Sequence, residues 1–224
     1  MKNTILFSCF LALMMTGCVQ PPSSSQTDKG LPAAVSSSLP QIGKWMFEQD
    51  TTKDQPAQWL GMKINNKTLF EPINLIIIDT ISGSDSASAT LILQRFATGG
   101  FQAREGHTAA YKGKMDNKNF GQLPLNGSNR AFSNYMWSFT NDHARLFGPY
   151  HKDNRFYWIG AASRELGISH DYLTFKEAAG EFEQQLTKFA ACKKLGYRFL
   201  DNMQNNQTDT TGDHDGYAVV LQIQ

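Results

Sequence analysis

The stretch Glu71-Pro72-Ile73-Asn74-Leu75-Ile76-Ile77-Ile78-Asp79 contains the most hydrophobic run in the chain after Cys18. Between Pro72 and Asp79 the residues are mostly β-branched or aliphatic, a pattern typical of a strand that is buried on both faces. Such a strand lies in the middle of a sheet, with helices packed near it. The stretch therefore predicts an α/β fold, and the segments around it indicate how the sheet continues.

A helix is predicted directly after this strand. Ser82-Gly83-Ser84-Asp85 offers side chains that cap a helix start, and residues 86–98 carry Ala, Leu, Ile and Phe at helical spacing. Gly99-Gly100 ends the pattern. With a further strand predicted over residues 101–103, this part of the chain forms a βαβ-like unit.

Other extended segments are predicted on both sides of this unit. Residues 59–64 and 68–70 flank a polar turn, and residues 143–150 and 155–162 flank Lys152-Asp153-Asn154, which predicts a hairpin. Three more strands are expected over residues 168–175, 197–200 and 217–223. A long polar loop is expected over residues 202–215.

Thr174 and Glu177 form a capping-box pattern at the start of a second helix, predicted over residues 177–194. Its apolar face consists of Ala178, Phe182, Leu186, Phe189 and Ala190. Cys192 is expected late in this helix as a buried, inert thiol, and Lys193-Lys194 at its C-terminal end. The predicted fold is α/β, with a mixed β-sheet of about five to seven strands and two main helices in a single sandwich-like domain.

Residues 1–17 have the features of a secretory signal peptide, because Lys2 supplies a positive charge before an almost unbroken apolar run over residues 4–15. A transmembrane anchor is the alternative, but it requires about 20 apolar residues. Met15-Thr16-Gly17-Cys18 resembles the lipobox of bacterial lipoproteins, in which the cysteine is acylated and becomes the first residue of the mature chain.

This resemblance implies a lipoprotein whose Cys18 carries the acyl chains, palmitate among them. Val19, where an aspartate would indicate retention in the inner membrane, implies the outer membrane, with the domain facing the periplasm. The Pro- and Ser-rich residues that follow contain almost no large apolar side chains, which predicts a flexible tether over residues 18–42. A single globular domain is predicted over residues 43–224.

Charge and cysteine content narrow the range of partners. The chain has 21 Lys and Arg and 20 Asp and Glu, and the loss of Lys2 with the signal would balance the two. Without a basic block, neither nucleic acid nor an anionic lipid surface is an expected partner, so membrane attachment depends on the acyl chains. Cys9 leaves with the signal and Cys18 is acylated, so Cys192 has no cysteine partner in the mature domain.

Candidate functional residues lie in short polar stretches that combine imidazole, carboxylate and guanidinium groups. The densest is Asp213-His214-Asp215; on an extended segment its two carboxylates would converge while His214 points away. The alternative is an Asx-type turn before the last strand. His143 and Arg145 share one face of their predicted strand. The candidate catalytic residues are His107, His143 and Arg145, and the candidate ligand-binding residues are Arg164, Asp213, His214 and Asp215.

Four blocks of the chain resemble the LssY C-terminal-domain family of bacterial membrane and exported proteins. They are Glu71-Pro72-Ile73-Asn74-Leu75-Ile76-Ile77, Phe132-Ser133-Asn134, His143-Ala144-Arg145-Leu146-Phe147-Gly148-Pro149, and Tyr157-Trp158-Ile159-Gly160-Ala161-Ala162-Ser163-Arg164-Glu165. The resemblance covers roughly residues 60–200 and implies an α/β domain in the cell envelope. It implies no catalytic residue, because no activity is defined for that domain.

Three functional hypotheses remain open from the sequence. The first is an envelope lipoprotein whose domain binds a protein or small-molecule ligand, since no Walker loop, Gly-x-Gly-x-x-Gly or His-Glu-x-x-His motif is present. The second is a metal-dependent hydrolase that uses His107, His143, Asp213, His214 and Asp215. The third is a structural lipoprotein without a ligand. No cofactor or metal is identified by the sequence.

Overall fold

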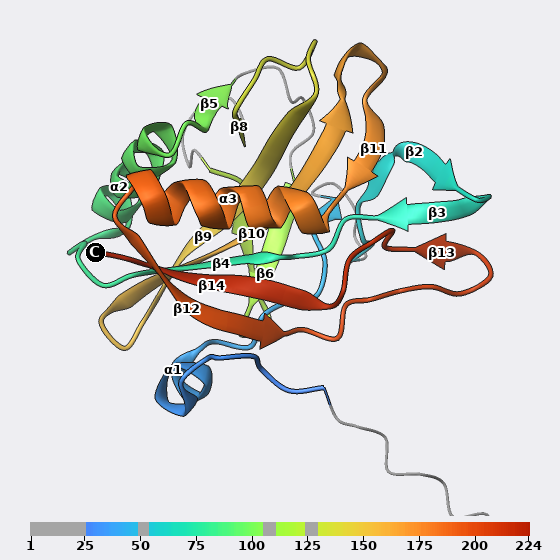
Figure 1. The fold of residues 1–224 in the computed structure, drawn as a ribbon. Coiled ribbons are helices and arrows are strands. Elements are labelled where there is room, and N and C mark those ends of the chain that lie inside the picture. The colour runs from blue at the N-terminus through green and yellow to red at the C-terminus, as the bar shows by residue number, and fades with distance from the viewer. Residues whose placement is uncertain (1–25, 49–53, 105–110, 124–129) are drawn as a thin grey trace, which may run out of the picture.

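The structure, a computed structural model, describes residues 26–48, 54–104, 111–123 and 130–224 (Figure 1). These residues form a mixed α/β body with two main helices, as predicted, and their strands form three sheets where one was predicted. Within the described residues, no helix is long and apolar enough to span a bilayer.

The main sheet has eight strands, one more than the upper end of the predicted range. Their bounds are Leu75–Asp79 (β4), Gln102–Arg104 (β5), Ala131–Ser133 (β8), Asn141–Lys152 (β9), Arg155–Leu166 (β10), Asp171–Thr174 (β11), Cys192–Phe199 (β12) and Tyr217–Ile223 (β14). Seven of them follow the order β12-β14-β4-β10-β9-β8-β5, and β11 pairs with β10. β4 runs parallel to β14 and antiparallel to β10, and all five of its residues are buried. The hydrophobic stretch is therefore an interior strand, as predicted.

The first main helix, α2 (Asp85–Thr98), follows β4 and ends before Gly99-Gly100. Ser84 caps it, because the Ser84 hydroxyl accepts a hydrogen bond from the Ala87 amide at 3.2 Å. The next strand, β5, lies at the far edge of the sheet, and β10, β9 and β8 separate it from β4. The predicted βαβ-like unit therefore crosses the sheet and does not join neighbouring strands.

The longest strands, β9 and β10, form the predicted hairpin in the middle of the sheet. Asp153 and Asn154 at its tip both have positive φ, 51° and 57°, as a two-residue hairpin turn requires. β2 (Gln58–Ile64) and β3 (Lys67–Phe70) form a second predicted hairpin around Asn65-Asn66. A short strand within the predicted polar loop, β13 (Asp209–Thr210), pairs with β3.

The second main helix, α3 (Lys176–Phe189), is shorter than predicted. Its start is as expected, since the Thr174 hydroxyl accepts from the Glu177 amide at 3.1 Å. At its end the prediction was wrong: the chain turns at Ala191, where φ is 48°, and Cys192 begins strand β12. Pairing with β14 along Cys192–Phe199 overrides the helical pattern there. Cys192 is buried, and burial raises the pKa of its thiol to about 11, which keeps it unreactive.

The predicted strand over residues 168–175 is also shorter in the structure. Gly167–Ser169 forms a 3-10 turn, and only Asp171–Thr174 is a strand. Between them His170 has a positive φ of 54°, which an extended strand does not allow.

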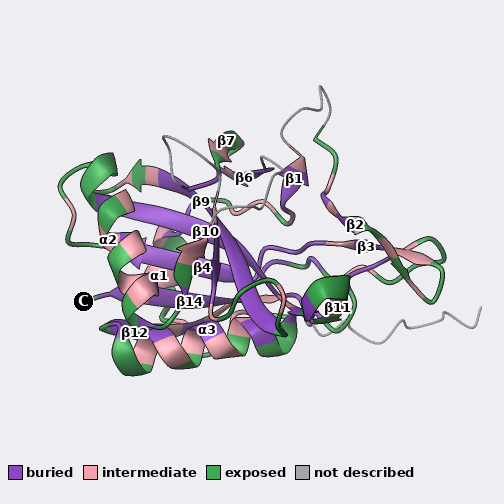
Figure 2. Cartoon of the chain, turned by 90° about the horizontal axis from the view of Figure 1, so that it is seen from above, coloured by how far each residue is buried: buried purple, intermediate pink, exposed green. Residues whose placement is uncertain are grey.

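The two faces of the main sheet carry separate hydrophobic cores. The helix-side core contains Ile77, Phe96 and Phe182, beneath α2 and α3. The opposite core contains Ile76 and Met115, and is covered by β1 (Phe47–Glu48), β6 (Tyr111–Met115) and β7 (Lys118–Gly121). Figure 2 shows α3 on one side of the buried strands and β1, β6 and β7 on the other.

Residues of the predicted tether pack against this body. Lys29 pairs with Tyr197 at the free edge of β12, and Asp28 accepts hydrogen bonds from the Phe199 amide and the Arg198 guanidinium. The short helix α1 (Ala33–Ser38) follows beneath β12 (Figure 1). Backbone pairing and these partly buried contacts place the start of the folded part before the predicted boundary at Gly43.

Candidate functional site

His143 and Arg145 lie on the face of β9 that is turned away from the helices. Their alternation with Ala144 and Leu146, which belong to the helix-side core, is as predicted. The face is neither solvated nor open to a partner, however, because both side chains are buried. With their neighbours they form a buried polar row that consists of Glu71, Asn141, His143, Arg145, Ser163 and Glu165.

One end of the polar row places a hydroxyl, an imidazole and a carboxylate in sequence. Ser163 Oγ lies 3.1 Å from His143 Nε2, and His143 Nδ1 lies 3.8 Å from Glu165 Oε1. Glu165 also accepts hydrogen bonds from Asn141 Nδ2 and His170 Nδ1, each at 3.0 Å. A nucleophile, a base and a residue that orients the base have this order in covalent catalysis.

Access to this group is closed. Ser163 is 1% exposed and His143 is 2% exposed. The indole of Trp59, on β2, lies over His143 with ring centroids 5.6 Å apart, and its Nε1 donates to the His170 carbonyl at 2.9 Å. A substrate therefore does not reach Ser163 in this arrangement of the described residues.

The other end of the polar row is an ion pair within a nonpolar environment. Arg145 Nη1 lies 3.4 Å from Glu71 Oε2, and the Arg145 guanidinium lies 4.8 Å from the centre of the Tyr111 ring. Burial raises the pKa of Glu71 to about 7, since the loss of hydration and the nearby Glu165 charge together outweigh the attraction of Arg145. This carboxyl therefore titrates near neutral pH.

Arg164 is on the helix side of β10 and holds the hairpin to α3. Its Nε and Nη2 donate to both carboxylate oxygens of Asp142, at 2.7 and 3.2 Å, and its Nη1 donates to Glu177 at 2.6 Å. These bonds occupy the guanidinium and join two strands to the first turn of the helix. The arrangement explains why Glu177 does not close the predicted capping box with its own side chain.

Asp213 is bound into the start of α3. Its carboxylate accepts hydrogen bonds from the Thr174 hydroxyl, from the Tyr172 hydroxyl and, at 2.8 Å, from the Phe175 amide. Burial opposes ionisation of Asp213, but these donors outweigh it and lower its pKa. Its geometry is that of a structural cap on a helix distant in the sequence, which differs from the local Asx-type turn that was the alternative.

His214 and Asp215 lie next to this cap. His214 is buried, and its Nε2 donates to Asn202 Oδ1 at 2.6 Å. Burial lowers the pKa of His214 to about 4, so the ring is neutral near pH 7. Asp215 accepts from the Tyr217 amide at 3.2 Å, as an Asx-type turn does, and its other oxygen lies 3.5 Å from Lys176 Nζ.

The candidate residues therefore do not form one site. His143 and Arg145 lie in the polar row, Arg164 lies on the opposite face of the sheet, and His214 and Asp215 line a pocket below α3 that none of those three residues lines. Within the described part of the chain, no group of three His, Cys, Asp or Glu is placed to hold a metal ion. Cys18 and His107 lie outside the described residues.

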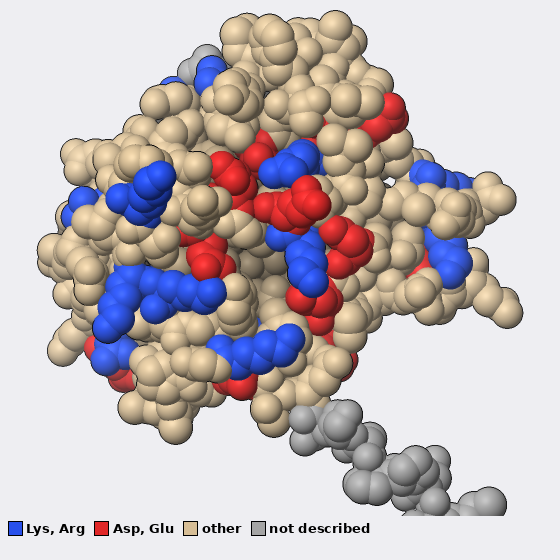
Figure 3. Space-filling model, viewed as in Figure 1, with Lys and Arg blue, Asp and Glu red and all other residues tan. Residues whose placement is uncertain are grey.

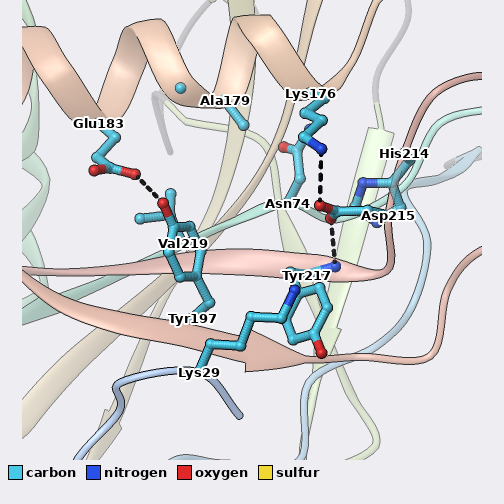
Figure 4. Close-up of a pocket in the computed structure, with 11 residues that line it drawn as sticks. Lys29, Asn74, Lys176, Ala179, Glu183, Tyr197, His214, Asp215, Tyr217 and Val219 are labelled. Atoms are coloured by element: carbon cyan, nitrogen blue, oxygen red, sulfur yellow. Dashed lines mark hydrogen bonds and ion pairs between the residues drawn. The ribbon is translucent and has the colours of Figure 1, made fainter. Parts of the chain in front are cut away.

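The pocket below α3 has a volume of about 340 Å³ and opens between the first half of the helix and strands β12 and β14 (Figure 4). This volume is at the lower end of the range for small-molecule sites. It is lined by Lys29, Asn74, Lys176, Ala179, Gly180, Glu183, Tyr197, His214, Asp215, Tyr217 and Val219.

Two small residues on α3, Ala179 and Gly180, are part of the pocket lining. Lys176, Ala179, Gly180 and Glu183 follow the i, i+3, i+4, i+7 spacing of one helix face, which here faces β14. A Cβ added at Gly180 would meet no atom within 4 Å, so packing does not require a glycine there. Glycine inside a helix costs up to about 1 kcal/mol relative to alanine. His214 and Asp215 were predicted as ligand-binding residues and do line this pocket, but the part of the lining on α3 was not predicted, although a glycine inside the helix was the available signal.

Charged and aromatic side chains surround the pocket. In Figure 4, Lys176 points toward Asp215 and Glu183 toward Tyr197. Glu183 accepts hydrogen bonds from the Tyr197 hydroxyl at 2.8 Å and from Lys194 at 2.7 Å. Lys and Arg side chains lie among Asp and Glu side chains over this face of the molecule, as Figure 3 shows.

Comparison with protein-family models, with curated proteins and with solved structures finds no significant match for this chain.

Proposed function

We propose that this protein is an acylated lipoprotein of the bacterial cell envelope whose α/β domain binds a small organic ligand in the pocket below α3. The observation that carries the proposal is the pocket of about 340 Å³ between α3 and strands β12 and β14, which Ala179 and Gly180 line on the helix side. The lining combines two aliphatic residues and two tyrosines with charged and amide side chains, groups that can hold and orient a small ligand.

The location is proposed from the N-terminal sequence. Cys18 within its lipobox-like junction supports acylation, and Val19 supports the outer membrane, with the domain in the periplasm. The resemblance to the LssY C-terminal-domain family supports an envelope role as well. Lipid chains on Cys18 would hold the domain at the membrane without a spanning helix.

Binding is favoured over hydrolysis by the state of the candidate catalytic residues. Asp213, which the hydrolase hypothesis includes, is held by the start of α3, and His143 is buried beneath Trp59. A hydrolase is kept as the second candidate because Ser163, His143 and Glu165 have the order of a nucleophile, base and orienting residue. A metal-dependent form would require His107 and a rearrangement of the described His and Asp residues.

The binding proposal is tested with two variants at one position. Gly180→Leu fills the space over β14, and Gly180→Ala adds only a methyl group at a site that is open within 4 Å. In a fragment screen by ligand-observed NMR, wild type and Gly180→Ala are expected to share hits that Gly180→Leu loses. Equal thermal unfolding of Gly180→Leu and wild type is the control for folding. Hits that persist in Gly180→Leu would rule out this pocket as the ligand site.

The hydrolase candidate has a separate test. A fluorophosphonate probe labels a serine only when a base activates it and the probe can reach it. Intact-mass measurement is expected to show no label on wild type, because Trp59 covers the group. A label that disappears in Ser163→Ala would make the hydrolase the better reading.

A further inference from the structure

We infer that the ligand of the pocket below α3 is a small monocarboxylate with an apolar or aromatic body, and that Lys29 binds its carboxylate. This inference rests on the proposed function, because it names the chemical class that the same pocket would accept. It also assigns a binding role to a residue in the segment that joins the acylated cysteine to the domain.

The charges around the pocket indicate one anionic group. Asp215 lies against Lys176, at 3.5 Å, and Glu183 lies against Lys194, at 2.7 Å, so each carboxylate has its own ammonium partner. Among the described residues, Lys29 has no carboxylate partner. Its ammonium group lies 3.6 Å from the centre of the Tyr217 ring at the edge of the pocket. One uncompensated ammonium favours a ligand with a single negative charge.

The remaining surface of the pocket favours a compact apolar body. Val219 on β14 and Ala179 on α3 are apolar residues of the lining, and Gly180 next to Ala179 carries no side chain. Tyr197 and Tyr217 add aromatic rings on strands β12 and β14. An aliphatic or aromatic group fits against these surfaces, while its carboxylate remains near Lys29 at the open side.

Lys29 is held in place by backbone pairing. Its amide donates to the Tyr197 carbonyl at 3.0 Å, and the Tyr197 amide donates to the Lys29 carbonyl at 2.8 Å. The neighbouring Asp28 accepts from Arg198 at 3.0 Å. A ligand that binds Lys29 therefore also favours the docked state of this segment, and docking favours the ligand by the same factor.

The test uses two matched pairs of probes, benzoate with benzamide and hexanoate with hexanamide. Each amide keeps the body of its partner and removes the negative charge. Titrations followed by protein NMR are expected to give affinities about tenfold higher for each carboxylate, the effect of one charge-assisted hydrogen bond. Lys29→Met is expected to reduce carboxylate binding to the level of the amide. Lys118→Met is the control, since Lys118 lies over the Tyr150 ring outside the pocket.

The outcomes separate this inference from the proposed function. The carboxylate assignment is overturned if carboxylate and amide bind with equal affinity, or if Lys29→Met changes the affinity for neither of them. In both cases the pocket remains a ligand site. A failure of all four probes to bind also overturns the assignment. Fragment hits that Gly180→Leu does not remove overturn the proposed function itself. Weaker carboxylate binding in Lys29→Met alone, with Lys118→Met equal to wild type, supports the inference.

Discussion

Glu71 and His214 are buried titratable residues whose pKa values move in opposite directions for one reason. Removal from water disfavours the charged form of each, so the pKa of the Glu71 carboxyl rises to about 7 and that of the His214 imidazole falls to about 4. Both groups are therefore held neutral inside the protein under mildly acidic conditions. Their effects on stability have opposite signs across the same pH range.

The pH dependence of the Glu71 contribution can be isolated with Glu71→Gln. The folded pKa of Glu71 is raised from 4.5 to about 7, so its contribution is present below pH 4.5 and is lost as the pH rises to 7. His214 contributes stability above pH 6.5 that is lost as the pH falls toward 4, which masks the effect in wild type. Urea unfolding measures the free energy of unfolding of each protein across this range. The value for wild type minus the value for Glu71→Gln is expected to fall as the pH rises. Parallel profiles for the two proteins would contradict the assigned pKa.

At the scale of elements, local signals predicted which helices and strands form better than where each one begins and ends. The apolar run 73–78, the Ser84 cap and the Asp153-Asn154 turn each depend on neighbouring residues, and each forms as predicted. Cys192 was assigned to a helix because its apolar spacing continues from α3. Pairing with β14, which is distant in the sequence, decides its strand conformation instead.

The difference between local signals and contacts between distant segments also explains which features of the candidate sites were predicted. The alternation of His143 and Arg145 is local and was predicted, but their burial depends on Trp59 and Tyr111 from other parts of the chain. The pocket likewise needs Lys29 and β14 to be brought to α3. Long-range packing of this kind is not contained in any short stretch of sequence.

Strand β4 gives a direct test at this scale. Ile76 belongs to the core away from the helices and Ile77 to the helix-side core, so their side chains point to opposite faces. Ile76→Asp and Ile77→Asp each place an unpaired charge in the interior, at a cost that exceeds about 4 kcal/mol. Both variants are expected to be lost from the soluble folded fraction. Thermal melts equal to that of wild type for either variant would show that this side chain is not interior.

At the scale of the whole molecule, one segment of the chain joins the proposed acylation site at Cys18 to the pocket below α3, the proposed ligand site. Asp28 and Lys29 lie against β12, and the chain from Cys18 to residue 25 precedes them. If Cys18 is acylated, the pocket is close in sequence to the membrane attachment. Binding of a ligand at Lys29 would then affect how the domain is held at the membrane.

The anchor is tested by Cys18→Ser. Because attachment is proposed to depend on acyl chains, the variant is expected to leave the membrane fraction or to accumulate as an uncleaved precursor. Density fractionation of wild type is expected to place it with the outer membrane. Wild type that does not incorporate radiolabelled palmitate would contradict acylation, whatever the fraction in which it is found.

The central claim is that the pocket below α3 is the ligand site, and amide chemical-shift mapping of isotope-labelled protein tests it most directly. Titration with the strongest fragment hit is expected to shift the amides of Lys176, Gly180, Tyr197 and Val219 together, with one dissociation constant. In Gly180→Leu the same titration is expected to leave these signals unchanged. Shifts centred on Trp59 and Ser163, with the α3 amides unaffected, would contradict the account and place the site at the buried polar row.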